Sequence, residues 1–216
     1  MLTTAKKASP SLYLLTNEEP FTLLYDKLNV AFASGVVDLL QVRRKATLQQ
    51  GRAALYQEAK QLTELANQYG IAVIINDDMT LAHELGVGVH LGKEDGQVAK
   101  ARQLLGAQAI IGASCYGSVA LVEQAKVQGA TYAALGAIFA SSTKPTAKVI
   151  NHSILQDAIK CDIDLCVIGG ITAENICLLQ HYSLRYVAVV SDILQYPIEQ
   201  TSKRCQQWQD ALSSWQ

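Results

Sequence analysis

The sequence alternates short apolar runs with amphipathic segments eight times, and this alternation constrains the fold more than any other feature. The apolar runs have the length of β-strands, and the segments between them have the residue spacing of α-helices. We expect strands at residues 11–16, 36–45, 71–75, 88–91, 109–113, 132–139, 165–168 and 186–190. We expect helices at residues 21–34, 48–69, 81–85, 98–105, 118–127, 154–159, 173–180 and 198–215.

Strands that are apolar on both faces and separated by helices predict a parallel sheet. Eight such units in 216 residues favour an α/β fold, a single closed (β/α)8 TIM barrel near its minimum size. The alternative is an open doubly wound sheet, but no Gly-x-Gly-x-x-Gly follows the first strand. We therefore expect one barrel domain at residues 11–216. Residues 1–10 are expected to be a loose leader, because they lack the apolar stretch of a signal peptide.

Composition narrows the partners. Half of the residues are hydrophobic and the net charge is −1, which argues against nucleic acid or a membrane surface as a partner attracted by bulk charge. No run approaches the roughly 18 apolar residues that a membrane helix needs. Five scattered cysteines without a Cys-x-x-Cys pair favour reduced thiols and a cytoplasmic protein. Whether the chain forms a homo-oligomer stays open at this point.

Polar side chains follow the carboxyl ends of the expected strands, where the active sites of these barrels lie. If residues 36–45 are extended, Gln41, Arg43 and Lys45 share one face. Cations of this kind suit a phosphorylated substrate, and nearby carboxylates suggest Mg²⁺, which usually takes one or two of them and completes its shell with phosphate oxygens and water. The candidate residues at this end are Gln41, Arg43, Lys45, Asn76, Asp77, Asp95, Ser114, Ser141, Ser142, Thr143, Lys144, Gly169, Gly170 and Ser191.

Each candidate also has a structural interpretation. Asp77 is a good residue to cap the helix that follows it, and Asp95 could lie in a solvated turn. The hydroxyl of Ser114 could bond to the backbone, and Gly170 could serve only a tight turn. We interpret His90, between two apolar neighbours, as structural. The placement of all the candidates at one end of the barrel is what favours a functional site.

Seven short motifs in this order resemble those of the thiamine-phosphate synthase family, from about residue 12 to residue 194. They read Gln-Val-Arg-Arg-Lys at 41–45, Ile-Ile-Asn-Asp at 74–77, Gly-Val-His-Leu-Gly-Lys-Glu-Asp at 88–95, Ile-Gly-Ala-Ser at 111–114, Thr-Lys-Pro at 143–145, Ile-Gly-Gly-Ile at 168–171 and Val-Ser at 190–191. Any one motif is weak, but together and in order they are specific.

The resemblance implies a reaction that joins 4-amino-2-methyl-5-hydroxymethylpyrimidine diphosphate to a thiazole phosphate, giving thiamine phosphate and diphosphate. It implies that the pyrimidine diphosphate is bound by Gln41, Arg43, Lys45, Asn76, Ser114 and Lys144. It implies that the thiazole phosphate is bound by Ser141, Ser142, Thr143, Gly170, Val190 and Ser191. Asp77 and Asp95 would hold Mg²⁺ as the cofactor.

The mechanism implied by the resemblance is dissociative. The pyrimidine methylene loses diphosphate, and the thiazole nitrogen attacks the resulting cation. Here Arg43, Lys45, Ser114 and Lys144 would be the catalytic residues, because they face the departing charge. No general base is required.

The sequence departs from the family pattern after the fifth and sixth strands, with Ser-Cys-Tyr at 114–116 and Ala-Ser-Ser-Thr-Lys at 140–144. These changes lie on the thiazole side, so a slower enzyme or one with an altered acceptor is compatible with the sequence. Two alternatives remain: a barrel similar to thiazole tautomerases, and a non-catalytic sensor of thiamine precursors. The complete set of diphosphate and metal residues counts against both.

Overall fold

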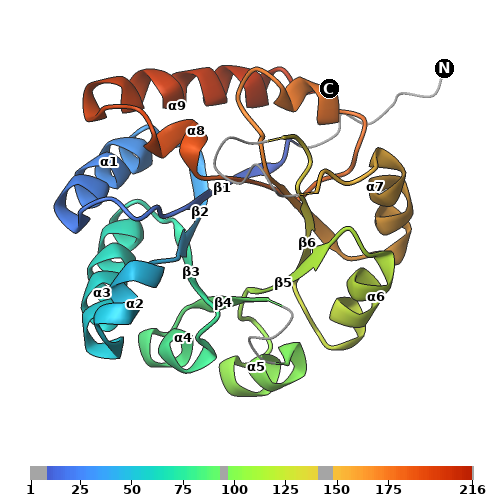
Figure 1. The fold of residues 1–216 in the computed structure, drawn as a ribbon, viewed down its shortest axis with the longest axis horizontal. Coiled ribbons are helices and arrows are strands. Elements are labelled where there is room, and N and C mark those ends of the chain that lie inside the picture. Colours follow the sequence, from blue (N-terminus) through green and yellow to red (C-terminus); the bar gives the residue numbers. More distant parts are fainter. Residues whose placement is uncertain (1–8, 93–96, 141–147, 216) are drawn as a thin grey trace.

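The computed structural model describes residues 9–92, 97–140 and 148–215, and within them the strands close into a parallel barrel surrounded by helices (Figure 1). Each strand pairs with its neighbours in sequence, and β1 also pairs with β8, which closes the ring. The expected single (β/α)8 TIM barrel is confirmed. The strands are β1 Ser11–Leu15, β2 Val37–Val42, β3 Ala72–Asn76, β4 Gly88–Leu91, β5 Ile111–Tyr116, β6 Tyr132–Gly136, β7 Asp164–Ile168 and β8 Tyr186–Val189.

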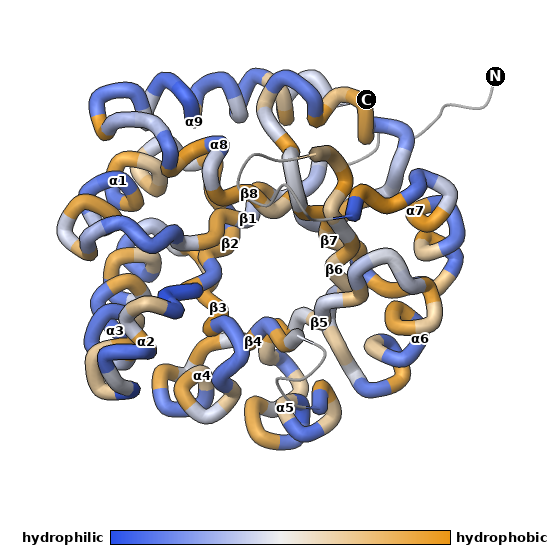
Figure 2. The backbone as a smooth tube through the Cα atoms, in the orientation of Figure 1, coloured by the Kyte–Doolittle hydropathy of each residue, from blue (hydrophilic) through white to orange (hydrophobic). Residues whose placement is uncertain are grey.

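The helices lie outside the barrel and follow the strands in order. The α-helices are α1 Phe21–Ala33, α2 Lys45–Gln50, α3 Arg52–Gln68, α4 Met79–Leu85, α5 Val98–Leu105, α6 Val119–Val127, α7 His152–Ala158, α8 Ser191–Leu194 and α9 Ile198–Ser213. Two 3₁₀ turns, η1 Ile159–Cys161 and η2 Ile176–Leu179, complete the described elements. Figure 2 shows hydrophobic residues along the strands and hydrophilic residues along the outer side of α9.

Alternation along the strands divides the core into two layers, because successive side chains of a strand point to opposite faces. In β1, Leu12 and Leu14 join the large core between strands and helices, whereas Tyr13 joins the smaller cluster inside the barrel. The interior cluster also contains Tyr132 and Tyr186, whose rings pack edge-on against each other and against Tyr13. Tyr13 and Tyr132 therefore place hydroxyl groups inside the barrel, where the two hydroxyls hydrogen-bond to each other.

Several expected boundaries are wrong for identifiable reasons. The second strand ends at Val42 rather than at Lys45, because Lys45 begins α2. The expected helix 48–69 is two helices that are separated at Gly51, whose φ of 126° is outside the helical range. The expected helix 173–180 is only the 3₁₀ turn η2, and the short helix α8 was not expected. The fifth strand extends beyond residue 113 and includes Ser114.

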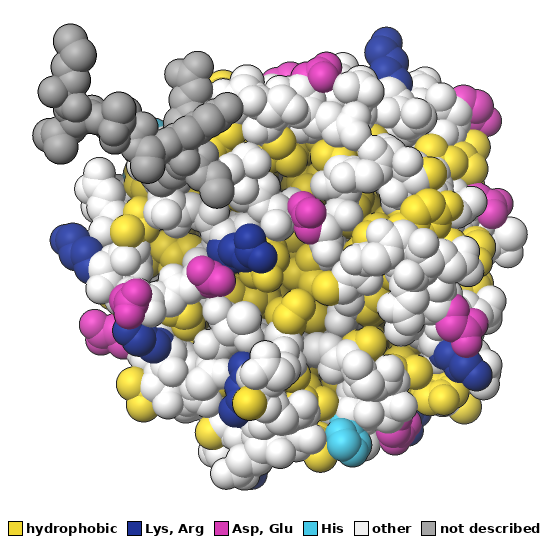
Figure 3. Space-filling view, turned by 180° about the vertical axis from the view of Figure 1, so that it is seen from behind, with side chains coloured by type: hydrophobic (Ala, Val, Ile, Leu, Met, Phe, Trp, Pro, Cys, Tyr) yellow, Lys and Arg dark blue, Asp and Glu magenta, His cyan; other side chains and the backbone are white. Residues whose placement is uncertain are grey.

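The far side of the molecule carries hydrophobic side chains near its centre, and its cationic side chains stand apart from one another (Figure 3). Among the described helices, none combines the length and the apolar character needed to cross a membrane.

All five cysteines are free thiols, and Cys115, Cys166 and Cys205 are buried. Cys161 is partly exposed and Cys177 is exposed.

Candidate active site

The segment after β2 places Gln41, Arg43 and Lys45 in three different environments. Gln41 lies inside the barrel, is 2% exposed and donates a hydrogen bond from Nε2 to the Tyr13 hydroxyl. The backbone N–H of Arg43 donates to Thr16 Oγ1 at 2.8 Å, which turns the chain out of the strand. The shared strand face expected for the three residues is therefore wrong for Lys45, which reaches the site from the first turn of α2.

Arg44 explains why the chain turns here. Its buried guanidinium donates to Glu58 Oε2 at 2.8 Å and to the backbone oxygens of Asn17 and Glu19 at 2.6 and 2.8 Å. These bonds join the segment after β2 to the segment after β1 and to α3. With Arg44 buried in this way, its neighbours Arg43 and Lys45 are held at the strand ends.

The end of β3 brings a carboxylate beside Lys45. Asp77 Oδ2 lies 3.6 Å from Lys45 Nζ and accepts a hydrogen bond from Asn76 Nδ2. The structural interpretation of Asp77 as a helix cap is wrong, because Asp78 takes that role by accepting from the Leu81 N–H at 2.8 Å. Asp77 has a φ of 67°, an uncommon conformation for a residue with a side chain, although Asp tolerates it better than most.

These residues fit a magnesium ion that is held mainly by substrate. Asp77 offers one partly exposed carboxylate at the end of the barrel, and Mg²⁺ commonly binds one or two carboxylates together with phosphate oxygens and water. Within residues 9–92, 97–140 and 148–215, no three His, Cys, Asp or Glu side chains are grouped to hold a metal without help. The donor set thus suits a metal that arrives with a diphosphate.

A chain of hydrogen bonds crosses the barrel interior from Ser114 to Gln41. Ser114 Oγ lies 2.9 Å from His90 Nε2, and His90 Nδ1 lies 2.8 Å from the Tyr132 hydroxyl. Tyr132 in turn donates to the Tyr13 hydroxyl at 3.1 Å, and Tyr13 accepts from Gln41. Burial raises the pKa of Tyr13 and of Tyr132 well above the ordinary tyrosine value, so both phenols are neutral near pH 7.

The sequence interpretation did not predict that His90 takes part in this hydrogen-bond network. His90 is half-buried and structural in the sense expected, but its imidazole contacts a candidate site residue. The strand period indicates this position, since Val89 and Leu91 face the helices and the residue between them must face the interior. Among the described residues, Ser114 therefore bonds to the side chain of His90.

The other side of the barrel end is formed after β7 and β8. Gly170 has a φ of 68°, and a Cβ there would lie 2.6 Å from the Phe139 carbonyl oxygen and 2.5 Å from that of Ala140. The turn after β7 is thus pressed against the segment after β6, where only glycine fits. Val190 directly follows β8 and packs on the interior cluster, and Ser191 begins α8.

Five candidate residues cannot be placed. Asp95, Ser141, Ser142, Thr143 and Lys144 lie outside the described residues. Their roles stay predictions, as does the boundary of the leader at residue 10.

A buried ion cluster behind Ser191 was also missed. Asp192 and Arg204 are both buried and bond to each other, whereas sequence interpretation selected only their neighbour Ser191. Two signals were available: Asp192 interrupts an apolar run, and Arg204 falls between Thr201 and Trp208 on the buried face of α9. A charge at a buried-face position of a helix indicates a buried partner.

A family model described as thiamine monophosphate synthase matches residues 12–193. Among solved structures, the chain is similar to thiamine phosphate pyrophosphorylase from Pyrococcus furiosus, with a TM-score of 0.76, 24% identity and coverage of 94% of this chain and 95% of that chain. It is also similar to thiamine phosphate pyrophosphorylase from Bacteroides thetaiotaomicron, with a TM-score of 0.67, 16% identity and coverage of 94% and 98%.

The same barrel occurs in 3-keto-L-gulonate-6-phosphate decarboxylase from Vibrio cholerae, with a TM-score of 0.71, 15% identity and coverage of 97% and 100%. At these identities the structural matches show a shared fold, and unrelated chemistry can occupy one fold. The family model is the stronger finding, because it covers most of the chain and spans the strand ends described above. The chain belongs to the thiamine monophosphate synthase family, and its barrel is that of an enzyme of this family.

Proposed function

We propose that the protein condenses 4-amino-2-methyl-5-hydroxymethylpyrimidine diphosphate with thiazole phosphate to give thiamine phosphate and diphosphate. Family membership supports the reaction class, and the residues at the strand ends support the choice of substrates. The partners are then small molecules, and the reaction is one of cytoplasmic thiamine biosynthesis.

One observation carries the proposal: Lys45 and Asp77 lie together at the carboxyl ends of neighbouring strands. Their side chains are 55% and 29% exposed, and an ion pair of this kind contributes only about 0–1 kcal/mol to stability. A contribution to the stability of the fold is therefore a weak explanation for the position of these two side chains. A cation and a carboxylate side by side suit a diphosphate that arrives with Mg²⁺.

We assign the pyrimidine diphosphate to the side of β2, β3 and β5. Gln41, Arg43, Lys45, Asn76 and Ser114 would bind it, and Lys144 would join them from outside the described residues. Gln41 and Ser114 are the two ends of the interior hydrogen-bond chain, so the substrate would rest on a prearranged set of donors and acceptors. Prearranged groups need no reorientation as charge develops.

We assign the thiazole phosphate to the side of β7 and β8. Gly170 lies in the turn after β7 and Ser191 at the start of α8, and the loops after the seventh and eighth strands commonly form a phosphate-binding site in these barrels. Val190 would pack against the thiazole ring, and Ser141, Ser142 and Thr143 would complete this side.

In the proposed mechanism the C–O bond between the pyrimidine methylene and the diphosphate breaks first. The bond between the thiazole nitrogen and that methylene carbon then forms. Magnesium bound by Asp77 and Asp95 would neutralise charge on the diphosphate oxygens. Arg43, Lys45 and Lys144 bind the remaining charge of the departing diphosphate, and Ser114 hydrogen-bonds to it. Bound on these two sides, the substrates would be held with the thiazole nitrogen in line with the methylene carbon.

The test is to supply both substrates with Mg²⁺ and to identify the products by mass spectrometry. The proposal expects thiamine phosphate and diphosphate in equal amounts. An isomerised thiazole with no thiamine phosphate would favour the tautomerase alternative. Binding of thiazole phosphate without any turnover would favour the sensor alternative, and either result would refute the proposal.

A further inference from the structure

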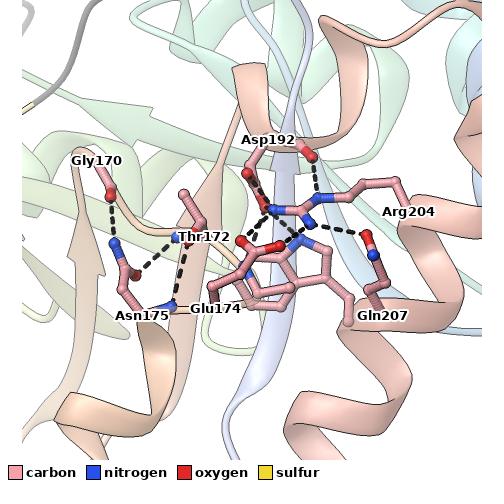
Figure 4. A network of polar contacts seen from close by, with 9 residues as sticks. Gly170, Thr172, Glu174, Asn175, Asp192, Arg204 and Gln207 are labelled. Carbon is pink, nitrogen blue, oxygen red and sulfur yellow. Dashed lines mark hydrogen bonds and ion pairs between the residues drawn. The ribbon is translucent and has the colours of Figure 1, made fainter.

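Arg204 of α9 is the centre of a polar network on the thiazole phosphate side (Figure 4). Its side chain is 4% exposed. One guanidinium nitrogen, Nη2, lies 2.6 and 2.7 Å from the two carboxylate oxygens of Asp192 and 2.7 Å from Glu174 Oε2. Nε donates to the backbone oxygen of Asp192 at 3.0 Å, and Nη1 donates to Glu174 Oε1 and to Gln207.

The two carboxylates belong to the two segments that form the proposed phosphate side. Glu174 lies in the turn after β7, and Asp192 directly follows Ser191 at the start of α8. The Asp192 carboxylate also accepts from the Ala173 N–H at 3.2 Å and from Trp208 Nε1 at 2.8 Å. Arg204 therefore joins three segments that are distant in the sequence.

The network continues to the glycine turn. Asn175 follows Glu174 and donates from Nδ2 to the Gly170 carbonyl oxygen at 2.9 Å. Its side-chain oxygen accepts from the Thr172 N–H at 2.9 Å, which closes the turn on itself (Figure 4). A displacement of Glu174 would thus be passed on to Gly170 through one neighbouring residue.

Arg204 also determines the charge on the thiazole phosphate side. A carboxylate beside Ser191 would repel a phosphate held there, unless a cation neutralises it. Burial raises the pKa of the Asp192 carboxyl, and the hydrogen bonds from Arg204 oppose that rise. Without Arg204, Asp192 would be left as a buried carboxylate without its cation.

We propose that Arg204 is a positioning residue for the phosphate of the thiazole substrate, acting through Glu174 and Asp192 on the Gly170 turn and on Ser191. Arg204 itself does not touch the substrate. Through the two carboxylates it fixes the separation of the two segments and cancels the negative charge that lies behind Ser191. This inference rests on the proposed function, because it concerns the thiazole phosphate side of the same site.

The test compares the KM values of the two substrates in Arg204→Gln, Glu174→Gln and the double variant Arg204→Gln with Asp192→Asn. Glu174→Gln is included because it should stay folded even if Arg204→Gln does not, since the Glu174 side chain is 65% exposed. Arg102→Gln is the matched control, since Arg102 also binds backbone oxygens, those of Gly129 and Ala109, but lies on α5. Circular dichroism of each variant reports whether it is folded.

In Arg204→Gln we expect the KM for thiazole phosphate to rise on the order of 10-fold, the lower end of the effect of lost supporting contacts. The KM for the pyrimidine diphosphate should change less than about 2-fold, because its residues lie on other strands. The double variant should recover part of the loss, because it removes the uncompensated carboxylate. Glu174→Gln should show a smaller rise in the same KM, and the control none.

Equal changes in both KM values, or none in folded Arg204→Gln and Glu174→Gln, would overturn the inference. Calorimetric titration with thiazole phosphate separates this inference from the proposed function, because it needs no turnover. If wild type makes no thiamine phosphate, selective loss of binding in Arg204→Gln still supports the positioning role. Equal binding by Arg204→Gln and wild type, or no binding by wild type, overturns it.

Discussion

The Gly112→Ala substitution should disturb the barrel interior and Ser114 together. Gly112 of β5 pairs with His90 on β4 and with Tyr132 on β6, so it lies between two residues that hydrogen-bond across it. A Cβ at this position would overlap the Tyr132 ring and would lie 2.6 Å from His90 Nδ1. Glycine is therefore required for the hydrogen bond between His90 and Tyr132.

The expected fall in the free energy of unfolding follows from the displacement of the Tyr132 ring. Tyr132 is fully buried, so the ring has little room to turn aside, and overpacking of a core typically costs about 1–3 kcal/mol. Displacing the ring also breaks its hydrogen bonds to His90 and Tyr13, each worth about 1 kcal/mol. The free energy of unfolding should fall by about 3–5 kcal/mol, measured by urea denaturation. The kcat should fall as well, because Ser114 loses its oriented partner.

Two comparisons separate this cause from a general effect of alanine. Gly106→Ala also introduces a Cβ, but no atom lies within 4 Å of it, so its cost is limited to the backbone conformation (φ 84°, ψ 173°), about 1–3 kcal/mol. Combining Gly112→Ala with Tyr132→Val removes the ring that the Cβ would overlap. We expect the two changes to be less costly together than the sum of the single variants. Additive losses would refute the argument from the clash.

Two further predictions concern stability. Asp78→Ala should lower the free energy of unfolding by about 1 kcal/mol, because the Leu81 N–H loses its cap, and Asp78→Asn should restore most of it; equal losses in both variants would contradict the capping role. Hydrogen bonds from Arg204 lower the pKa of the Glu174 carboxyl from 4.5 to about 2. Wild type should therefore have a higher free energy of unfolding than Glu174→Gln, with the full difference above pH 4.5 and a smaller one as the pH falls toward 2. Denaturation curves between pH 6 and pH 3 test this, and a difference independent of pH would contradict it.

The fold was predictable because it depends on patterns of apolar residues that can be recognised in short stretches of sequence. Apolar strands separated by helical spacing determine a parallel sheet, and the number of units determines the closed barrel. Boundaries were less predictable where two signals compete. Lys45 continues a polar alternation typical of a strand, but the bonds of buried Arg44 turn the chain there and allow α2 to begin.

The proximity of candidate side chains was predictable where each of them follows the end of a strand. The neighbourhood of Lys45 and Asp77 is of this kind, although the reason expected for Lys45 was wrong. Contacts between distant strands were harder to predict. The hydrogen bond between His90 and Tyr132 requires Gly112 to lie between them, and this depends on the register of three strands. The pairing of Asp192 with Arg204 likewise depends on how α9 packs.

The measurement that tests the central claim most directly is the Mg²⁺ dependence of thiamine phosphate formation in wild type, Asp77→Asn and Asp78→Asn. Asn tolerates the backbone conformation of Asp77 and can also cap α4 at Asp78, so each variant removes one carboxylate and little else. We predict that wild type and Asp78→Asn form thiamine phosphate in the presence of Mg²⁺, and that Asp77→Asn loses at least about 100-fold in kcat/KM. Equal activity of the two variants, or formation of thiamine phosphate by wild type without a divalent metal, would contradict the account.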